Sequence, residues 1–575
     1  MKLRGEQPMS DAPFYREYLD YAALTRQLQH WAERHPDLVR LQSLQTTPEK
    51  REIWLLTIGL EPERPRPAVW VDGNMHAGEL AGSSVALAIA EAAIALHMDD
   101  DPQWPDHLLA QLRDVLFHIC PRISPDGAEA VLTRGGFVRS VPRNPGRQPL
   151  EACWEPADLD GDGRCRFIRM EDPAGDFVAS ADHPGLMLPR VADDPPPWYR
   201  LFPEGEIVNW DGRTIPEPAF LRQTTDLNRN FPWNWAPEPA QLGAGDYPGS
   251  EPESRAIIQF ATANPNLYAW LNLHTFGGVF IRPLGEKPDS DMHGGDLALY
   301  RQLEAWAEED TGYPTVSGYE EFTYEPGKPL HGDLTDFAYH QRGCLAEVCE
   351  LWDLFTRLGL PRPKRFVDYY ASLSREDMEA LAGWDAKENR GRIFRNWTAI
   401  DHPQLGPVEV GGQDPLIGLW NPPPEALPGL CRGMARYWLR VAAMLPRLVI
   451  ERTQVTTLDG GNYAVEVDVA NHGYLGTCGI PSSRDLPVNH PLRASLVTTG
   501  CSLLAAEDNA REIGQLDGWG RGVGDGSHMP WFQRSVGNRR RETLRWIVRG
   551  EGTGTVRVGN QRLGWVERTV AVGEG

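Results

Sequence analysis

Apolar residues recur along the first three quarters of the chain with two spacings, which predict alternating helices and strands. Helical spacing predicts helices over residues 18–35, 81–97 and 252–263, and a helix over 427–444 that closes the domain. Short apolar or alternating runs predict strands over 51–58, 67–72, 115–121 and 344–352. This alternation indicates an α/β domain, a three-layer α/β/α arrangement around a mixed, mostly parallel sheet. In such sheets, ligands bind at the carboxyl ends of the strands.

The pattern of apolar and polar residues changes at about residue 445. From there, short alternating strands lie between Gly, Asp and Asn turns, at 448–450, 463–469, 492–497, 543–548 and 555–558. We therefore expect a catalytic domain over 1–444 and a smaller β-sandwich domain over 445–575, used for packing or recognition. Residues 144–222 are rich in Pro, Asp, Gly and Trp with little periodicity, so we expect a loop-rich insertion there, which restricts access to a cleft.

Composition narrows the classes of partner. At 575 residues the chain is too long for one core, and its net charge of −23 argues against nucleic acid as a partner, since phosphate binding depends on clustered Lys and Arg. No stretch approaches a membrane span, and residues 1–10 lack the apolar core of a signal peptide, so we expect a cytoplasmic protein that does not bind membranes. The eight cysteines are scattered without CxxC pairs and predict reduced thiols. The oligomeric state is not readable from the sequence.

A metal site is the main chemical feature of the pattern. The predicted strand 67–72 ends in a Gly/Asn turn, followed at once by His76 and Glu79. A second apolar run, 268–273, ends in His274. Imidazole nitrogen and carboxylate oxygen both bind zinc, and three protein ligands with an open position make a catalytic site. His-x-x-Glu alone more often marks a capped helix start, so the remaining motifs decide.

Two further segments offer groups for binding and catalysis. Asn228, Arg229 and Asn230 place a guanidinium between two amides, which suits a bidentate carboxylate, although a polar turn before Pro232 explains the same pattern. The strand 344–352 carries Glu347 and Glu350 in an apolar run, where carboxylates are costly to bury unless they are paired or used. Because strand side chains alternate, these two face opposite sides and at most one reaches a site.

A calcium site is a weaker expectation. Asp158, Asp160 and Asp162 place three carboxylates on one tight loop inside the insertion, which suits a hard cation. An EF-hand loop would have a bidentate Glu where this chain has Arg169, so a turn held by Asx hydrogen bonds explains the pattern at least as well.

With these pieces together, residues 18–353 resemble the zinc metallocarboxypeptidases of the carboxypeptidase A type, peptidase family M14. His76 and Glu79 match the family's His-x-x-Glu, and His274 matches its third zinc ligand. Pro125-Asp126-Gly127 matches its Pro-Asp-Gly turn, and Asp226 to Phe231 matches the segment whose Asn-Arg pair, here Asn228 and Arg229, holds the terminal carboxylate of the substrate.

The resemblance implies roles for three further positions. Arg139 matches the arginine that polarises the scissile carbonyl, with Arg143 as its rival. Glu350, in 348–353, matches the general base, with Glu347 as the alternative. A tyrosine that caps the substrate is expected in the loop before Asp336, and Tyr324 is the best match.

The implied function is zinc-dependent hydrolysis of the C-terminal bond of a peptide with a free carboxylate, by a zinc-activated water and a Glu base. One alternative is an amidase of the same family that acts on peptidoglycan stem peptides or another non-standard amide; another is a non-catalytic binding protein. In the family the preferred C-terminal residue is set just before Asp336. Leu334 and Thr335 here suggest a neutral or aromatic preference, while Asp333 leaves a basic one open.

Overall fold

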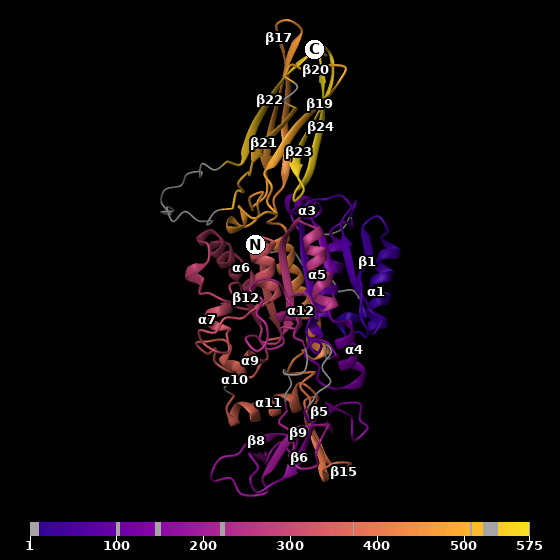
Figure 1. Ribbon diagram of the computed structural model, residues 1–575, viewed down its shortest axis with the longest axis vertical. Coiled ribbons are helices and arrows are strands. Elements are labelled where there is room, and N and C mark those ends of the chain that lie inside the picture. Colours follow the sequence, from indigo (N-terminus) through magenta and orange to yellow (C-terminus); the bar gives the residue numbers. More distant parts are fainter. Residues whose placement is uncertain are drawn as a thin grey trace.

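The computed structural model describes residues 11–98, 104–143, 151–218, 225–371, 373–505, 509–520 and 539–573. A central α/β domain lies between a C-terminal β domain at one end of the molecule and a group of short strands at the other (Figure 1). Parts of the expected insertion, 144–150 and 219–222, fall outside the described residues. None of the described helices has both the length and the apolar character needed to cross a bilayer.

The central sheet is mixed and mostly parallel, as expected. Its strands lie in the order β1 (Val39–Thr46), β2 (Glu52–Ile58), β4 (Leu116–Cys120), β3 (Ala68–Gly73), β11 (Leu267–Thr275), β14 (Leu345–Leu351), β12 (Val279–Arg282) and β13 (Thr315–Ser317). Its middle strands β4, β3, β11 and β14 are parallel, so their carboxyl ends meet at one edge. Every residue of β3 and β11 is buried, which explains why these runs are almost wholly apolar up to Asp72 and Asn272.

Helices cover both faces of this sheet. The described helices are α1 (Tyr21–Arg34), α2 (Ala81–Ala95), α3 (Asp106–Leu112), α4 (Pro125–Arg134), α5 (Pro252–Ala263), α6 (Gly294–Thr311), α7 (Gly318–Glu321), α8 (Leu334–Asp336), α9 (Leu354–Arg357), α10 (Asp368–Ala371), α11 (Arg375–Lys387) and α12 (Leu427–Ala442). The helices α2, α6 and α12 cover one face, with α12 in contact with both α2 and α6. On the other face, Phe260 of α5 and Phe337 pack against Trp70 and Trp270.

The Pro-Asp-Gly segment differs from the expected turn. Pro125 occupies the first turn of α4, where its missing N–H has no helical partner to lose. Asp126 is fully buried and accepts a hydrogen bond from Thr47 Oγ1 (2.8 Å). The segment therefore begins a helix and anchors the 47–51 loop, and its residues do not line the cleft.

The expected loop-rich insertion contains more regular structure than its composition indicated. Its strands are β5 (Cys153–Pro156), β6 (Phe167–Glu171), β7 (Phe177–Ala179), β8 (Met187–Pro189), β9 (Tyr199–Pro203) and β10 (Gly205–Val208). The sheet β15-β16-β6-β9-β7-β8 also takes in a hairpin from far downstream, β15 (Phe394–His402) and β16 (Gly406–Gln413). We call these strands the insertion module. Strands of three to five residues show too little alternation to be predicted, and their partner is distant in sequence.

The C-terminal part is the expected β sandwich. One sheet contains β17 (Leu448–Leu458), β18 (Asn462–Asn471), β22 (Arg541–Arg549) and β20 (Ser502–Leu503); the other contains β21 (Ala510–Gly514), β19 (Leu492–Thr499), β23 (Gly552–Asn560) and β24 (Gly564–Val572). Arg562 is 1% exposed. It donates to the carbonyl oxygen of Leu267, the first residue of β11, and to that of Gly343, two residues before β14 (both 2.9 Å). The β domain is therefore joined to the sheet edge opposite the strand ends that carry His274 and Glu350.

Candidate metal centre and active site

The loop after β3 is held in shape by its own side chains. A Cβ at Gly73 would lie 2.6 Å from the carbonyl carbon of Gly82, so only glycine fits this turn. Asn74 adopts a positive φ of 54°, which Asn tolerates better than most residues. Its buried amide donates to the carbonyl oxygens of His76 (2.8 Å) and Ala77 (3.1 Å). These contacts direct His76 and Glu79 toward the end of the neighbouring strand β11.

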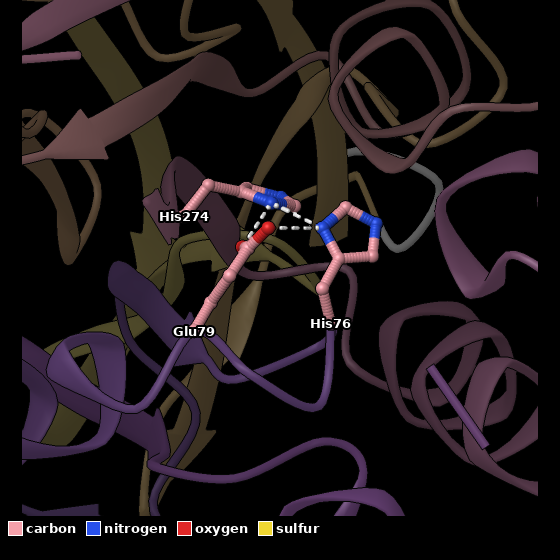
Figure 2. A group of neighbouring side chains, drawn as sticks. All are labelled: His76, Glu79 and His274. Carbon is pink, nitrogen blue, oxygen red and sulfur yellow. Dashed lines mark hydrogen bonds and ion pairs between the residues drawn. The ribbon is translucent and has the colours of Figure 1, made fainter. Parts of the chain in front are cut away.

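His76, Glu79 and His274 converge at one point (Figure 2). Glu79 Oε1 lies 2.8 Å from His76 Nδ1, and Glu79 Oε2 lies 2.9 Å from His274 Nδ1. The two Nδ1 atoms are 3.0 Å apart. All three groups offer a ligand atom within 4.8 Å of the others, so the donor set fits a single zinc ion.

The outer nitrogens of both histidines have partners, which leaves the Nδ1 atoms for the metal. His76 Nε2 lies 3.1 Å from Asp226 Oδ1, and His274 Nε2 lies 2.6 Å from Asn272 Oδ1. Asn272 in turn donates to the buried carboxylate of Asp72. Such partners orient ligand histidines and raise their basicity. We did not predict Asp226 or Asn272 as part of the site, although Asn272 stands two residues before His274 and so on the same strand face.

The charges of the cluster favour an ionised carboxylate at Glu79. Burial raises the pKa of Glu79, but the neighbouring His76 and His274 outweigh it and lower that pKa well below its usual value. Burial would lower the pKa of His274, yet Glu79 raises it. A buried acid kept ionised beside two imidazoles matches what a divalent cation requires of its ligands.

The two candidate bases, Glu347 and Glu350, lie on opposite sides of the strand β14. Glu350 pairs in register with His274 of β11 and lines the cavity that contains the three donors. Burial raises the pKa of Glu350 to about 8 in the absence of a metal ion. Glu347 faces the opposite side, where its carboxylate accepts a hydrogen bond from Tyr437 of α12. Glu350 is therefore the one that reaches the site.

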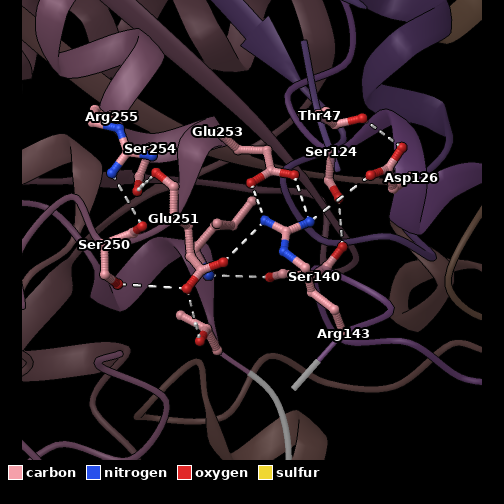
Figure 3. Close-up of polar contacts among 12 residues, drawn as sticks. Thr47, Ser124, Asp126, Ser140, Arg143, Ser250, Glu251, Glu253, Ser254 and Arg255 are labelled. Carbon is pink, nitrogen blue, oxygen red and sulfur yellow. Dashed lines mark hydrogen bonds and ion pairs between the residues drawn. The ribbon is translucent and has the colours of Figure 1, made fainter. Parts of the chain in front are cut away.

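The two candidate arginines, Arg139 and Arg143, also differ in whether they reach the site. Arg139 Nε donates to Asp226 Oδ2 (3.1 Å), and its Nη1 lies 3.6 Å from Glu79 Oε1, so the guanidinium stands beside the metal ligands. Arg143 instead forms ion pairs with Glu251 (2.9 Å) and Glu253 (Figure 3). Only Arg139 of this pair lines the cavity.

Asn228 and Arg229 lie in the same cavity, in the short turn η2 (Leu227–Arg229). Asn228 Oδ1 accepts a hydrogen bond from the Leu334 N–H (2.9 Å), which fixes the amide. Arg229 Nη1 donates to its neighbour's carbonyl oxygen (2.6 Å), and among the described residues no carboxylate forms an ion pair with it. We call Asn228 and Arg229 the carboxylate clamp.

The cavity has a volume of about 1040 Å³ and is open to solvent along one side. Tyr324 lines it and is 61% exposed, a position from which a ring can close over a ligand. Tyr370, which we did not predict, also lines it, with its hydroxyl donating to the Phe276 carbonyl oxygen. Pro156 and Phe167 of the insertion module and the adjoining Glu204 form part of the wall.

The expected calcium site stays a prediction, because Asp158, Asp160 and Asp162 each bring a carboxylate oxygen within 4.8 Å of the others but also hold their own loop. Asp158 accepts backbone hydrogen bonds from Gly161 (2.8 Å) and Gly163 (2.8 Å), and Asp162 pairs with Arg166. These contacts form the Asx-held turn that was the alternative explanation of the pattern.

Comparison with known proteins agrees with this geometry. The profile of the zinc carboxypeptidase family matches residues 24–186 and 189–370. The chain belongs to the zinc carboxypeptidase family. The expected zinc metallocarboxypeptidase, a hydrolase of peptide bonds, is thereby confirmed, and zinc is the metal of the family. A second profile, a domain of unknown function (DUF8731), matches residues 447–571 and so covers the β domain.

Similarity to individual zinc carboxypeptidases is low. Carboxypeptidase B2 of Rattus norvegicus is 20% identical over 373 residues, which are 63% of this chain and 68% of that protein. Carboxypeptidase D of Mus musculus is 28% identical over 143 residues, 24% of this chain but only 10% of that protein. The crystal structure of thrombin activatable fibrinolysis inhibitor shares 15% identity and a TM-score of 0.43, with 76% of each chain covered.

Proposed function

We propose that this zinc carboxypeptidase releases single residues from peptides that end in a free carboxylate. The observation that carries the proposal is the carboxylate clamp. Arg229 forms no ion pair with a carboxylate among the described residues, although the charges of Asp226 and Asp333 act on it, and it lines the cavity of His76, Glu79, His274 and Glu350. A guanidinium beside a fixed amide is suited to an anionic group of a ligand.

The clamp sets which bond is cut. A terminal carboxylate bound by Asn228 and Arg229 places the preceding peptide bond near the metal ligands, because all these groups share one cavity. Zinc held by His76, Glu79 and His274 supplies a Lewis acid and makes water more acidic. Glu350 takes the proton of the attacking water and then passes it to the leaving amine.

Two further residues complete the proposed site. Arg139 donates to the carbonyl oxygen as negative charge develops on it; losing one such donor typically lowers turnover by about 10²–10³. Asp226 holds Arg139 and His76 together, because its two oxygens contact one each. Tyr324 closes over the bound residue from the exposed rim of the cavity.

The proposal is tested with zinc-loaded protein and pairs of peptides that differ only in a free or amidated C terminus. We expect chelator-sensitive release of the last residue from the free acid alone. Arg229→Met should lower kcat/KM by about 10²-fold or more, since a charged hydrogen-bonded pair is lost. The exposed Arg301→Met serves as the matched control.

Two outcomes would contradict this. Equal cleavage of the amidated peptide would show that the clamp does not select a carboxylate. Zinc binding without release from any peptide would favour the amidase alternative, and peptidoglycan stem peptides, which also carry a free carboxylate, would be the next substrates.

A further inference from the structure

A group of apolar side chains on the cavity wall has no part in the steps proposed so far. Phe137, Phe276, Leu419 and Trp420, which we call the apolar wall, all line the cavity, and each is half-buried. The ring centroids of Phe137 and Trp420 are 5.2 Å apart. Leu419 and Phe276 pack on the same apolar cluster, which includes Trp352. The four side chains therefore form an apolar surface that a ligand in the cavity can reach.

The apolar wall adjoins the metal ligands. A Cβ at Gly78 would lie 3.3 Å from Trp420 Cε3, closer than ordinary van der Waals contact. Glycine at this position therefore lets the tryptophan ring lie against the chain between His76 and Glu79. Phe276 follows the third donor, His274, by two residues. A peptide bond at the metal ligands would thus have this wall beside it.

The segment that carries Leu419 and Trp420 is fixed at both ends. The fully buried Asn421 donates to the Gly78 carbonyl oxygen (2.7 Å) and accepts a hydrogen bond from the Ala81 N–H (2.9 Å). At the other end, Asp414 forms an ion pair with Arg164 (2.8 Å), just ahead of β6. A surface that is held in place before a ligand arrives costs less entropy to bind to.

Half of the apolar wall comes from a part of the chain outside both matched profiles. The zinc carboxypeptidase profile ends at residue 370, and the second profile begins at residue 447. Leu419 and Trp420 lie in the stretch between them, shortly after the hairpin of β15 and β16. This hairpin lies at the end of the α/β domain that faces away from the β domain (Figure 1). The wall is therefore an addition to the part of the chain that the family profile covers.

The clamp and the apolar wall reach the metal ligands through different residues. Asp226, two residues before Asn228 of the clamp, contacts His76 Nε2 (3.1 Å), whereas Trp420 reaches the same loop at Gly78. The cavity volume of about 1040 Å³ is more than a single residue fills, since pockets of roughly 300–1,000 Å³ hold drug-sized ligands. With the last residue between the clamp and the metal ligands, the wall is left for the residue before the scissile bond.

Resting on the proposed function, we propose that the apolar wall binds the side chain of the penultimate residue of the substrate. The preferred substrates are then peptides with a large aliphatic or aromatic residue before the one that is released. Contact with the wall removes apolar surface of this side chain from water. It also holds the acyl side of the scissile bond at the metal ligands, as the clamp holds the other side, so the gain is expected in kcat/KM.

The test uses the zinc-loaded full chain and acetylated tripeptides that share one last residue and differ only in the penultimate residue: phenylalanine, leucine, asparagine, which has nearly the shape of leucine but is polar, and glycine. We expect kcat/KM for phenylalanine to exceed that for glycine by about 10- to 100-fold, the effect of burying a large apolar side chain. Leucine should exceed asparagine in the same way. Trp420→Ala and Leu419→Ala should each lower the ratio of phenylalanine to glycine by about threefold or more, because each removes part of the wall.

The exposed Trp519→Ala, in the β domain, is the matched control and should keep the wild-type ratio. The zinc content of each variant is measured as well, because Trp420 contacts the loop of the metal ligands. The inference is overturned if wild type cleaves the glycine peptide as well as the phenylalanine peptide, or if the ratio survives in both zinc-loaded variants. If one variant binds no zinc, the wild-type ratio and the other variant decide. Failure of the proposed function is a different result, since no peptide of the set would then lose its last residue to the wild-type enzyme.

Discussion

The strand β14 carries a glutamate at two positions that face opposite sides of the sheet, so the same Glu→Gln substitution can be compared at both. Glu350→Gln should lower kcat by about 10²–10⁴-fold, because the proposed general base loses its proton acceptor. Glu347→Gln should leave kcat close to wild type, because its carboxyl contacts Tyr437 on the helix-covered face. Both replacements preserve size, so the comparison isolates the position of the carboxyl group.

The same variant of Glu347 has a calculable effect on stability. Glu347 is 1% exposed, and burial raises its pKa from 4.5 to about 7. At about 1.36 kcal/mol for each pKa unit, ionisation in the folded state costs about 3 kcal/mol. Below about pH 4.5 the group is protonated in both states and this cost is absent. Between about pH 4.5 and 7 only the unfolded state ionises, so the stability of the folded chain falls as the pH rises.

Glutamine cannot ionise and still accepts the hydrogen bond from Tyr437. We therefore expect Glu347→Gln to be more stable than wild type by up to about 3 kcal/mol at pH 8, and by much less at pH 4.5. Denaturant titrations of both proteins at the two pH values measure this difference. Glu512→Gln, an exposed residue of β21, should show no such dependence.

Two results would refute this reasoning. Loss of activity in Glu347→Gln with retention in Glu350→Gln would exchange the roles of the two residues. An equal stability difference between Glu347→Gln and wild type at both pH values would mean that the buried carboxyl does not change its ionisation across this range.

Three other perturbations follow from the contacts described above. Asp226→Asn should weaken zinc binding by about 10- to 100-fold in a chelator competition, since the partner of His76 Nε2 loses its charge. An unchanged zinc affinity would show that Asp226 does not support His76 as a ligand. Removing zinc should abolish peptide release, and one equivalent should restore it; activity that survives a demonstrably metal-free preparation would contradict the assignment of the three donors. Arg562→Met should lower the free energy of unfolding by about 2–4 kcal/mol in denaturant titrations, because several buried carbonyl oxygens lose a charged donor; a stability equal to wild type would show that the interface does not depend on it.

The sequence was most informative where local pattern and tertiary environment agree. Fully buried strands such as β11 are read correctly because nearly every side chain before the functional residue at the end is apolar, Asn272 being the exception. His76 and His274 are 198 residues apart, and their meeting was predicted from the shared edge of parallel strands and from the match of His274 to the family's third zinc ligand. Helix α5 was predicted over 252–263 and is observed there, because Pro252 marks its first turn.

The remainder depends on contacts between distant segments. The hairpin of β15 and β16 completes a sheet with strands more than 200 residues earlier, and neither part shows this by itself. The partners of the histidines, Asp226 and Asn272, are ordinary polar residues until the fold brings them to a ring nitrogen.

The contact made by Arg562 also bears on the order in which a growing chain can complete its structure. The carbonyl oxygens that it binds belong to residues 295 and 219 positions earlier, so they are synthesised long before their partner. At roughly 5–20 residues per second, the interval is on the order of 10 to 60 seconds. The metal ligands and Glu350 all emerge from the ribosome within that interval or before it. The sheet that carries them therefore lacks the hydrogen bonds from Arg562 until the last part of the β domain has been synthesised.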